Sequence, residues 1–571
     1  MNLHSLKVEI DFMELAPMRI RQSCPYLAVA LLILVGLLRI SSTYNVFCQS
    51  WDAPAHIARG MEWIDRGKYT YSHEHPPLGP IMVALGPYFV GARSTGQECR
   101  YDEGNNLLHY NDAYGRNLTL ARLGVLPFFV IATLVVWMWT KSYFGGIAAL
   151  LSVILFTTLP PVLAHSGLAT TDMAITAMFV AALFTFYLWL ENPTLLRSVL
   201  LGITVGLACI AKFSALVFLP TSGSLIAILY YFRKTDHKDR HRPRIKRWIA
   251  ASGIAVLMCL LIIWAGYRFS STTLTRMDKR PHTSIDRIVG TKGLLHDAAY
   301  FIAENVPLLA PEFFSGIREV AQHNKYGHVA YLLGEAYTEG RWYFFPIIIA
   351  VKTPLPFLLL TTTGFFMVSR HVVMQRRDIH FLAPAVAAIG VLAVGMLSKL
   401  NLGLRHVLPM FPLVAILAGY GAFMLWRFRQ SRGIGPMLLT ALLVWQIASS
   451  IAAHPDYLAY YNEVAGDHPE DIVLGTTDWG QDAKRLATTL KNREIDELSI
   501  CYYGSADLDK LGLPPRRDLI PYQKTTGWIA ASLLCNKVGA FEPPYDHFSW
   551  LEAYEPVEVV GKSIRLYYIP E

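Results

Sequence analysis

Three residues that could do acid–base chemistry stand at helical spacing after the first apolar segment. Asp52, His56 and Arg59 occupy positions i, i+4 and i+7. If a helix begins here, it presents a carboxylate, an imidazole and a guanidinium on one face, which suits work on a charged substrate. The alternative is that Asp52 only caps the helix, because Asp is a favoured N-cap and Pro54 is tolerated in a first turn. His56 and Arg59 are then solvated or interfacial side chains.

Five more polar side chains stand at the ends of apolar segments further along the chain. They are Arg122, Asp172, Lys212, Arg405 and His406. A charge at the centre of a membrane span costs about 2.5–3.5 kcal/mol, so span ends are where charges are expected. There they either face a functional cavity or simply extend to the membrane surface. Spacing alone leaves both interpretations open.

The composition predicts that membrane helices position these residues. Of the 571 residues, 53% are apolar and 16% are charged, against roughly 45–50% and 25% in soluble globular chains. We predict an α-helical polytopic membrane protein with about 11 transmembrane helices. The predicted spans are Tyr26–Tyr44, Ala121–Thr140, Gly146–Leu163, Met173–Leu190, Ser198–Ile210, Ser214–Phe232, Trp248–Tyr267, Phe344–Val368, Phe381–Leu397, Val407–Trp426 and Ile434–Ala452.

The distribution of basic residues predicts the orientation of the spans. The segment 233–247 holds eight basic and two acidic residues between two spans, which favours cytoplasmic anchoring over nucleic-acid binding. No DNA or RNA partner is predicted. With a cytoplasmic N-terminus, the short basic loops all fall on the cytoplasmic side. The membrane part, 1–452, then has two long outer loops, 45–120 and 268–343, and the segment 453–571 also lies outside.

The segment 453–571 differs from the rest of the chain. It holds 11 basic and 19 acidic residues. Short β-like runs and one helix predict a small α/β domain; these elements are Ile472–Thr476, Leu498–Tyr503, Ser563–Ile569 and the helix Gln481–Asn492. The motif Asp478-Trp479-Gly480-Gln481 has no assigned role, and the alternative interpretation is that Asp478 only begins that helix.

Four of the seven cysteines fall in the predicted outer parts. Cys48 and Cys99 bracket the first outer loop, and Cys501 and Cys535 lie in the C-terminal domain. Two disulfides, Cys48–Cys99 and Cys501–Cys535, are therefore plausible in an oxidising compartment. Two pairs of free thiols are the alternative, which spacing does not exclude.

The first outer loop resembles that of the protein O-mannosyltransferase (dolichyl-phosphate-mannose-protein mannosyltransferase) family, which belongs to the GT-C glycosyltransferases. Those enzymes place an Asp after the first span and an HPPLGK-like element further on, matched here by Asp52 and by His75 to Gly79. The family's Asp is usually followed by Glu, where this chain has Ala53, and its terminal Lys is Pro80 here. These departures bear on the acceptor and the branch, and not on the superfamily.

Looser matches follow in order, at Arg122, Thr171-Asp172, Ala211-Lys212-Phe213 and Leu404 to Pro409. The resemblance implies a GT-C-like fold and a polyprenyl-phosphate sugar donor, whose phosphate leaves easily beside fixed positive charge. Lys212, Arg405 and His406 are the candidates for that charge. Asp52 is the predicted base for the acceptor hydroxyl, and a single displacement with inversion needs only one carboxylate. The candidate substrate-binding residues are His56, Arg59, His75, Arg122, Asp172, Lys212, Arg405 and His406.

No metal or other cofactor is predicted. Nucleotide-sugar enzymes commonly hold a diphosphate through a metal and a DxD motif. Asp507-Leu508-Asp509 matches only as part of an acidic segment, and Asp112-Ala113-Tyr114 lacks the second acid.

The main alternative is a secondary transporter or lipid flippase, which many spans also allow. Such folds have paired repeats and polar sites at the membrane midplane, and no convincing repeat pair is evident. An anchored sensor domain would not need about eleven spans. The predicted partners are the lipid-linked donor, membrane lipids and a protein or glycolipid acceptor. The predicted location is the cell inner membrane with the site facing the periplasm, or the endoplasmic reticulum membrane if the host is eukaryotic.

Overall fold

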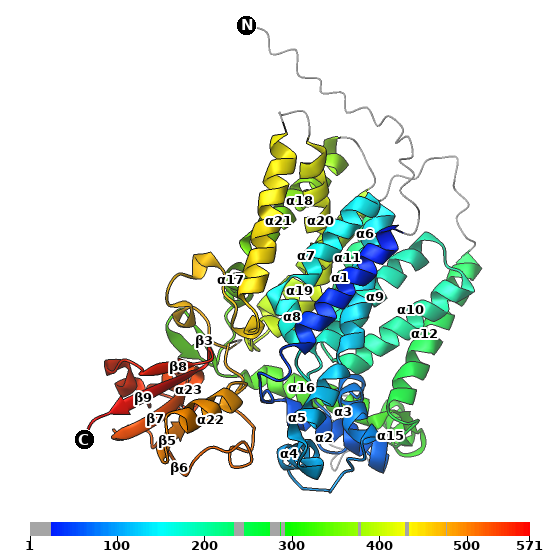
Figure 1. The fold of residues 1–571 in the computed structure, drawn as a ribbon. Helices are drawn as coiled ribbons and strands as arrows, with labels where there is room; N and C mark the ends of the chain where they lie inside the picture. The colour runs from blue at the N-terminus through cyan, green and yellow to red at the C-terminus, as the bar shows by residue number, and fades with distance from the viewer. Residues whose placement is uncertain are drawn as a thin grey trace.

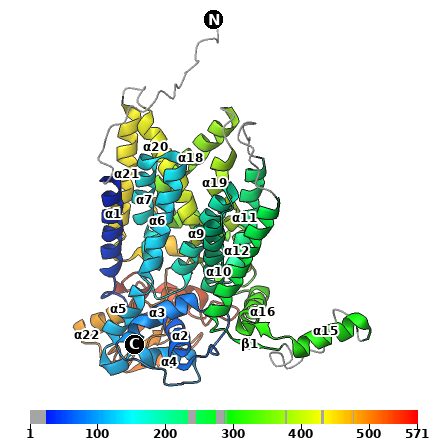
Figure 2. The ribbon, with the colours of Figure 1, turned by 90° about the vertical axis from the view of Figure 1, so that its right-hand side faces the viewer.

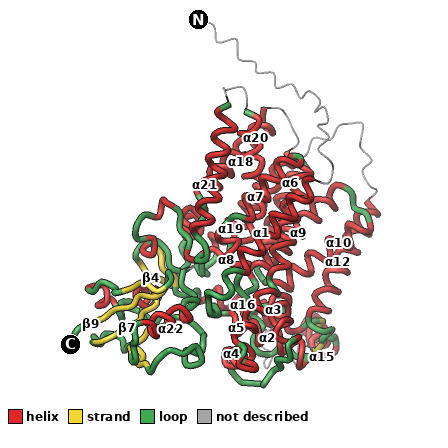
Figure 3. Tube along the Cα trace, in the orientation of Figure 1, coloured by secondary structure: helices red, strands yellow, loops and turns green. Residues whose placement is uncertain are grey.

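The fold is a helical bundle with a small sheet domain attached to one end (Figure 1). The computed structural model describes residues 24–232, 245–273, 286, 290, 292–374, 379–428, 433–475 and 477–571. Most of the basic segment 233–247 and the first 23 residues lie outside the described part. Among the described residues, strands form the sheet of the C-terminal domain and two short pairs in the second outer loop, 271–272 with 308–309 and 330–332 with 335–337. Figure 3 shows strands in the C-terminal domain and helices through the bundle.

Apolar helices occupy all the predicted spans. Their bounds are α1 Cys24–Ser41, α6 Leu126–Phe144, α7 Gly146–Thr157, α8 Pro160–Ser166, α9 Asp172–Glu191, α10 Leu195–Ala211, α11 Ala215–Tyr231, α12 Ile245–Gly266, α17 Phe344–Lys352, α18 Leu355–Met374, α19 Ala383–Leu397, α20 Phe411–Arg427 and α21 Ile434–Ala452. In the described part, seven helices are long and apolar enough to cross a membrane, and the bent pair α7–α8 gives an eighth. The predicted number is larger because three predicted spans are helices of only 17 or 18 residues, α1, α10 and α11.

Helices α9 and α20 form the centre of the bundle, where close helix contacts depend on small residues. Gly419 of α20 faces Ser152 of α7, and Gly421 of the same helix faces Leu360 and Gly364 of α18. A Cβ at Gly419 would lie 1.9 Å from the Ser152 hydroxyl oxygen, so the two helices could not keep this distance with a larger residue. Small residues serve the same purpose in membrane helix pairs generally.

The span predicted as Phe344–Val368 is broken between α17 and α18. Proline cannot donate a backbone hydrogen bond, and Pro354 stands at the break. The Asn462 side-chain amide donates to the carbonyls of Ala350 and Thr353, at 2.5 Å and 2.7 Å. The carbonyls freed by the break therefore find partners inside the protein, as a break at membrane depth requires.

The two long outer loops and the C-terminal domain lie at the same end of the bundle (Figures 1 and 2). The first loop contains α2 Ala53–Met61, a short π-helix Glu62–Arg66, α3 Leu78–Phe89, α4 Arg100–Leu108 and the first part of α5 Tyr114–Leu123. The second contains β1 Ser271–Thr272, α15 Leu294–Asn305, β2 Leu308–Leu309, α16 Pro311–Tyr326, β3 Ala330–Leu332 and β4 Glu335–Tyr337. Figure 2 shows α16 beside the bundle and α15 extending away from it.

The C-terminal domain is a five-stranded mixed sheet in the order β6-β5-β7-β9-β8. The bounds are β5 Leu498–Cys501, β6 Arg516–Asp518, β7 Gly527–Ser532, β8 Glu558–Val560 and β9 Ile564–Ile569. Strand β5 pairs in parallel with β6 and β7, whereas β9 is antiparallel to β7 and β8. The helices of the domain are α22 Ala483–Asn492 and the short α23 Leu533–Val538.

Two predicted elements of this domain differ in the structure. The stretch predicted as a strand at 472–476 forms only one isolated bridge, Val473 to Leu332, within its described residues. A strand needs a continuous pairing edge, and the turns around Val473 do not provide one. The predicted helix begins two residues later than expected, with Asp482 at its N-cap, so Asp478 does not begin it.

One of the two predicted disulfides is present. Cys501 at the end of β5 is bonded to Cys535 in α23. The predicted Cys48–Cys99 bond is wrong, because both thiols are free. Cys48 is buried against the C-terminal domain, where its Sγ donates to the Gly480 carbonyl at 3.0 Å, while Cys99 is exposed at the start of α4.

Candidate active site

A cavity of about 670 Å³ opens where the bundle, both outer loops and the C-terminal domain meet. This volume is within the range of ligand-binding pockets. Seven of the nine candidate site residues line it: Asp52, His56, His75, Asp172, Lys212, Arg405 and His406. Arg59 and Arg122 do not. Another part of the wall is apolar and comes from α11, α16 and α19; it includes Leu216, Val217, Phe218, Ile317, Val320, Val394 and Leu397.

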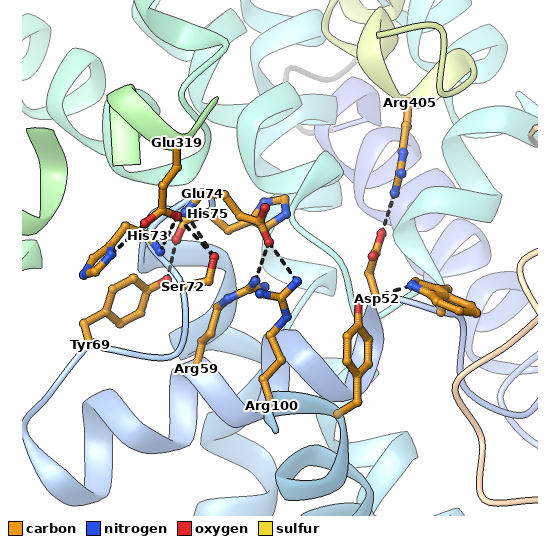
Figure 4. A network of polar contacts seen from close by, with 12 residues as sticks. Asp52, Arg59, Tyr69, Ser72, His73, Glu74, His75, Arg100, Glu319 and Arg405 are labelled. Carbon is orange, nitrogen blue, oxygen red and sulfur yellow. Dashed lines mark hydrogen bonds and ion pairs between the residues drawn. The ribbon is translucent and has the colours of Figure 1, made fainter. Parts of the chain in front are cut away.

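Asp52 directs its carboxylate at Arg405 from the opposite wall of the cavity (Figure 4). It occupies the N-cap position of α2, but its side chain makes no capping hydrogen bond. Instead, Arg405 Nη1 donates to Asp52 Oδ2 at 2.6 Å. The alternative that Asp52 serves only as a helix cap is therefore wrong, and an ion pair joins residues 353 positions apart.

His56 and Arg59 follow Asp52 on α2, and both are buried. The His56 ring meets the His75 ring edge to face, with centroids 4.7 Å apart. Arg59 Nη2 donates to Glu74 Oε1 at 2.7 Å, and Arg100 lies 3.2 Å from the same oxygen. Arg59 thus supports the cavity wall from behind by holding Glu74, as Figure 4 shows.

A second ion pair lies where α9 begins and α10 ends. Lys212 Nζ is 2.8 Å from Asp172 Oδ1, and Thr170 donates to the other carboxylate oxygen at 3.1 Å. The Asp172 side chain is 3% exposed and that of Lys212 is 16% exposed. These two charges therefore face the cavity and do not extend to the membrane surface. The same holds for Arg405, which is paired with Asp52.

Three histidines of the cavity wall, His56, His75 and His406, are neutral at neutral pH. Burial and the nearby charge of Arg59 lower the pKa of His56 to about 3. Burial and the neighbouring His56 hold the pKa of His75 well below its usual value. His406 was a candidate for fixed positive charge, but burial, together with Lys212 and Arg405, lowers its pKa in the same way. The positive charge that faces Asp52 and Asp172 therefore comes from Arg405 and Lys212.

Arg122 stabilises the fold and does not reach the cavity. Its two terminal nitrogens donate to the backbone carbonyls of Tyr44, Phe47 and Cys48, at 2.7–3.2 Å. Arg122 therefore holds the loop segment 44–48, which leads from α1 towards Asp52. The expectation that Arg122 binds substrate is not supported by this geometry.

Arg122→Met is expected to lower the free energy of unfolding by about 3 kcal/mol, because truncating a charged donor leaves buried carbonyls unpaired. The donor KM should stay within about twofold of the unchanged protein. Thermal unfolding in detergent and a donor titration measure the two quantities. Arg116→Met on the exposed side of α5 is the matched control and should change neither. A large rise in KM with unchanged stability would assign Arg122 to the substrate.

The sequence interpretation missed several residues of the cavity wall. Glu74 and Arg100 form an ion pair at its edge, and Tyr101 accepts a hydrogen bond from Trp51 Nε1 at 3.1 Å. Trp479 and Tyr503 come from the C-terminal domain. Two of these residues lay in stretches that the sequence marked: Glu74 directly precedes His75, and Trp479 belongs to the motif Asp478-Trp479-Gly480-Gln481. The others are brought in by contacts between distant segments, which spacing does not reveal.

The comparisons with known proteins agree with this architecture. Residues 29–273 match the sequence model of the family described as dolichyl-phosphate-mannose-protein mannosyltransferase. The structure of the Saccharomyces cerevisiae protein O-mannosyltransferase Pmt1–Pmt2 complex bound to the sugar donor has a similar fold, with a TM-score of 0.53 at 11% identity, over 87% of this chain and 94% of that one. The chain is a multi-pass membrane glycosyltransferase. Its fold is that of the GT-C enzymes.

Two further structures are similar to this glycosyltransferase over most of its length. ArnT from Cupriavidus metallidurans bound to undecaprenyl phosphate matches at 14% identity and a TM-score of 0.46, over 94% of this chain and 97% of that one. The Archaeoglobus fulgidus oligosaccharyltransferase AglB, in complex with an inhibitory peptide and a dolichol-phosphate, matches at 14% identity and a TM-score of 0.44, over 94% and 73%. No protein of curated function is significantly similar in sequence. Nothing in these comparisons favours the transporter alternative.

Proposed function

We propose that this glycosyltransferase moves a sugar from a polyprenyl-phosphate donor to a hydroxyl acceptor in one displacement that inverts the anomeric carbon. The observation that carries the proposal is the cavity itself. The Asp52 carboxylate and the cations Lys212 and Arg405 face a space that has an apolar wall between membrane helices. A lipid-linked sugar phosphate has this same division into an apolar tail and an anionic head.

The donor phosphate would bind at Arg405 and Lys212. A guanidinium and an ammonium form strong charge-assisted hydrogen bonds with phosphate oxygens. The Nε–H of Arg405 is buried and has no protein acceptor among the described residues, so this side chain has a donor to spare. The prenyl tail would lie along the apolar wall formed by α11, α16 and α19.

Asp52 would act as the base. In the proposed step, the acceptor hydroxyl gives its proton to the Asp52 carboxylate, and its oxygen forms the new bond to the anomeric carbon. The bond from that carbon to the phosphate oxygen breaks, and its electron pair leaves with the phosphate. Negative charge grows on the phosphate as it departs, which is where fixed cations stabilise a transition state.

Donor binding would also make Asp52 a better base. Burial raises the pKa of the Asp52 carboxyl, but the charge of Arg405 outweighs it and holds the pKa below its usual value. A phosphate at Arg405 competes for the same guanidinium. As the ion pair with Arg405 weakens, the pKa of Asp52 rises toward the range of a useful base. The base would thus gain strength only when the donor is in place.

The location and the acceptor belong to the same proposal. We place the site on the periplasmic side of a bacterial inner membrane, or the lumenal side of the endoplasmic reticulum in a eukaryotic host. The disulfide Cys501–Cys535 beside the site supports an oxidising compartment. Basic residues at the far ends of the spans, Lys141, Arg197 and Arg427, support a cytoplasmic face there. A protein or an envelope glycolipid would provide the acceptor hydroxyl.

The test uses the full-length protein in proteoliposomes with a radiolabelled undecaprenyl-phosphate hexose. Envelope proteins and glycolipids from cells that lack this chain serve as acceptors. The expected result is label in one acceptor class, one undecaprenyl phosphate released per sugar transferred, and an inverted anomeric bond. Transfer from a nucleotide sugar alone would overturn the donor assignment. Retention at the anomeric carbon would overturn the single displacement, and movement of lipid without transfer would revive the flippase alternative.

A further inference from the structure

The loop 477–482 of the C-terminal domain, which we name the DWGQ loop, is joined to the chain just before Asp52. The Trp51 backbone N–H donates to the Trp479 carbonyl at 2.9 Å, and the Cys48 N–H donates to the Gln481 carbonyl at 3.0 Å. Two backbone hydrogen bonds therefore connect this loop to the segment 48–51, which leads into α2. The conformation at Asp52 depends on a part of the sequence more than 400 positions away.

The Trp479 ring lies against the guanidinium of Arg405. The Arg405 Cζ is 4.6 Å from the ring centroid, and Trp479 is only 5% exposed. The indole Nε1 donates to the Gly475 carbonyl at 3.0 Å, which fixes the orientation of the ring. A cation over the face of a buried Trp is the strongest form of cation–π contact. Arg405 is thus held between an aromatic face and the Asp52 carboxylate.

Hydrogen bonds within the DWGQ loop and to α23 hold its conformation. Asp478 accepts from the backbone N–H groups of Gly480 and Leu534, both at 3.2 Å. The Gln481 side chain bridges the loop, donating to the Thr477 carbonyl and accepting from the Trp479 N–H, both at 2.8 Å. Gly480 has φ = +75°, a conformation that favours glycine. The loop can therefore hold the indole in one place.

We propose that Trp479 is a positioning residue for sugar transfer, which holds the Arg405 guanidinium beside Asp52 and facing the cavity. The C-terminal domain then completes the active site by supplying this aromatic face. The inference rests on the proposed roles of Asp52 and Arg405. Without the indole, Arg405 has space to leave the carboxylate, so both the base and the phosphate site lose their geometry.

The test is Trp479→Leu, which removes the aromatic face but keeps an apolar side chain. The donor kcat/KM is expected to fall about tenfold or more, as the loss of a desolvated cation–π contact implies. The acid limb of the pH profile of kcat/KM should move up by about one unit, because a weaker contact with Arg405 raises the pKa of Asp52. In the described part of the chain, the charged and titratable groups that face Asp52 are His56, Arg59, Asp172, His328, Arg405 and Tyr503, and of these Arg405 is the one that contacts the indole. The His165 ring, 5.6 Å from the indole, faces Asp172 instead.

Three comparisons decide the outcome. Trp479→Phe keeps a ring face and should retain more activity than Trp479→Leu, with a smaller shift of the limb. Trp528→Leu removes an indole from β7, away from the cavity, and should leave the profile unchanged. In an Arg405→Ala background, Trp479→Leu should have no further effect, since contacting residues are not additive.

If the acid limb of Trp479→Leu does not move, the positioning role is overturned, whether or not the thermal stability falls. The proposed function would still stand. Additive losses in the double variant would overturn the positioning role as well. Full activity in Asp52→Asn would instead remove the proposed base, whatever Trp479 does. The two failures are therefore distinguishable.

Discussion

Asp52→Asn is expected to lower the rate of sugar transfer by roughly 10²- to 10⁴-fold, the contribution that a positioned general base makes to proton transfer. Asparagine has nearly the same size as aspartate and can still accept a hydrogen bond from Arg405, so the cavity should keep its shape. What it cannot do is take the proton of the acceptor hydroxyl. The loss should therefore appear in kcat, while the donor KM stays within a few fold.

The pH dependence follows from the state of this carboxyl. Because Arg405 holds the pKa of Asp52 below its usual value, the base is ionised throughout the neutral range. In the unchanged protein, kcat/KM for the donor reports the donor-free enzyme, so it should be lost only as pH falls through that lowered pKa. Transfer at limiting donor in proteoliposomes, measured from neutral to acidic pH, gives this acid limb.

Asp102→Asn is the matched control for this substitution. Asp102 is an exposed carboxylate on α4 in the same outer loop, and its variant should transfer sugar at the normal rate. Asp52→Glu keeps a base but moves it by one methylene, so partial activity is expected. Asp52→Asn with undiminished kcat would remove the proposed base and require another proton acceptor, for which Glu74 is the next carboxylate in the cavity wall.

The sequence predicted candidate reacting groups, which the structure brings to one cavity, but not their partners. Asp52, Lys212 and Arg405 were found because charges at the ends of apolar segments are costly and because the first loop resembles a known family. Which carboxylate pairs with which cation depends on helix packing. The Asp52–Arg405 pair joins α2 to the turn before α20, and the Lys212–Asp172 pair joins α10 to α9.

Residue type and spacing do not predict the state of a side chain where burial determines its charge or its partner. His406 is a plausible cation by its type, yet burial beside two other cations keeps it neutral. Cys48 and Cys99 bracket a loop as a disulfide pair would, but Cys48 is covered by the C-terminal domain. Trp479 could not be placed in the cavity at all, because the DWGQ motif reaches Arg405 only after the C-terminal domain has folded against the first outer loop.

Arg405→Ala is the second substitution with a large expected effect, and it separates two functions of one guanidinium. Loss of a preorganised charge at a departing phosphate costs on the order of 10²- to 10³-fold in kcat. The same variant removes the partner of Asp52, so the pKa of that carboxyl should rise and the acid limb should move to higher pH. A donor KM increase is expected in addition, because Arg405 is one of the two cations available to the phosphate.

Lys212→Met provides the contrast that makes this prediction specific. Lys212 pairs with Asp172 and not with Asp52, so its loss should weaken donor binding and leave the acid limb in place. Arg93→Ala, an exposed arginine of the first loop, should change neither quantity. Arg405→Lys keeps one charge but loses the planar fork and its stacking on Trp479, so it should recover only part of the activity. A limb that moves equally in the Lys212 and Arg405 variants would mean that the pKa of Asp52 reflects the whole field of the cavity. The proposal that the donor phosphate competes with Asp52 for the Arg405 guanidinium would then lose its support.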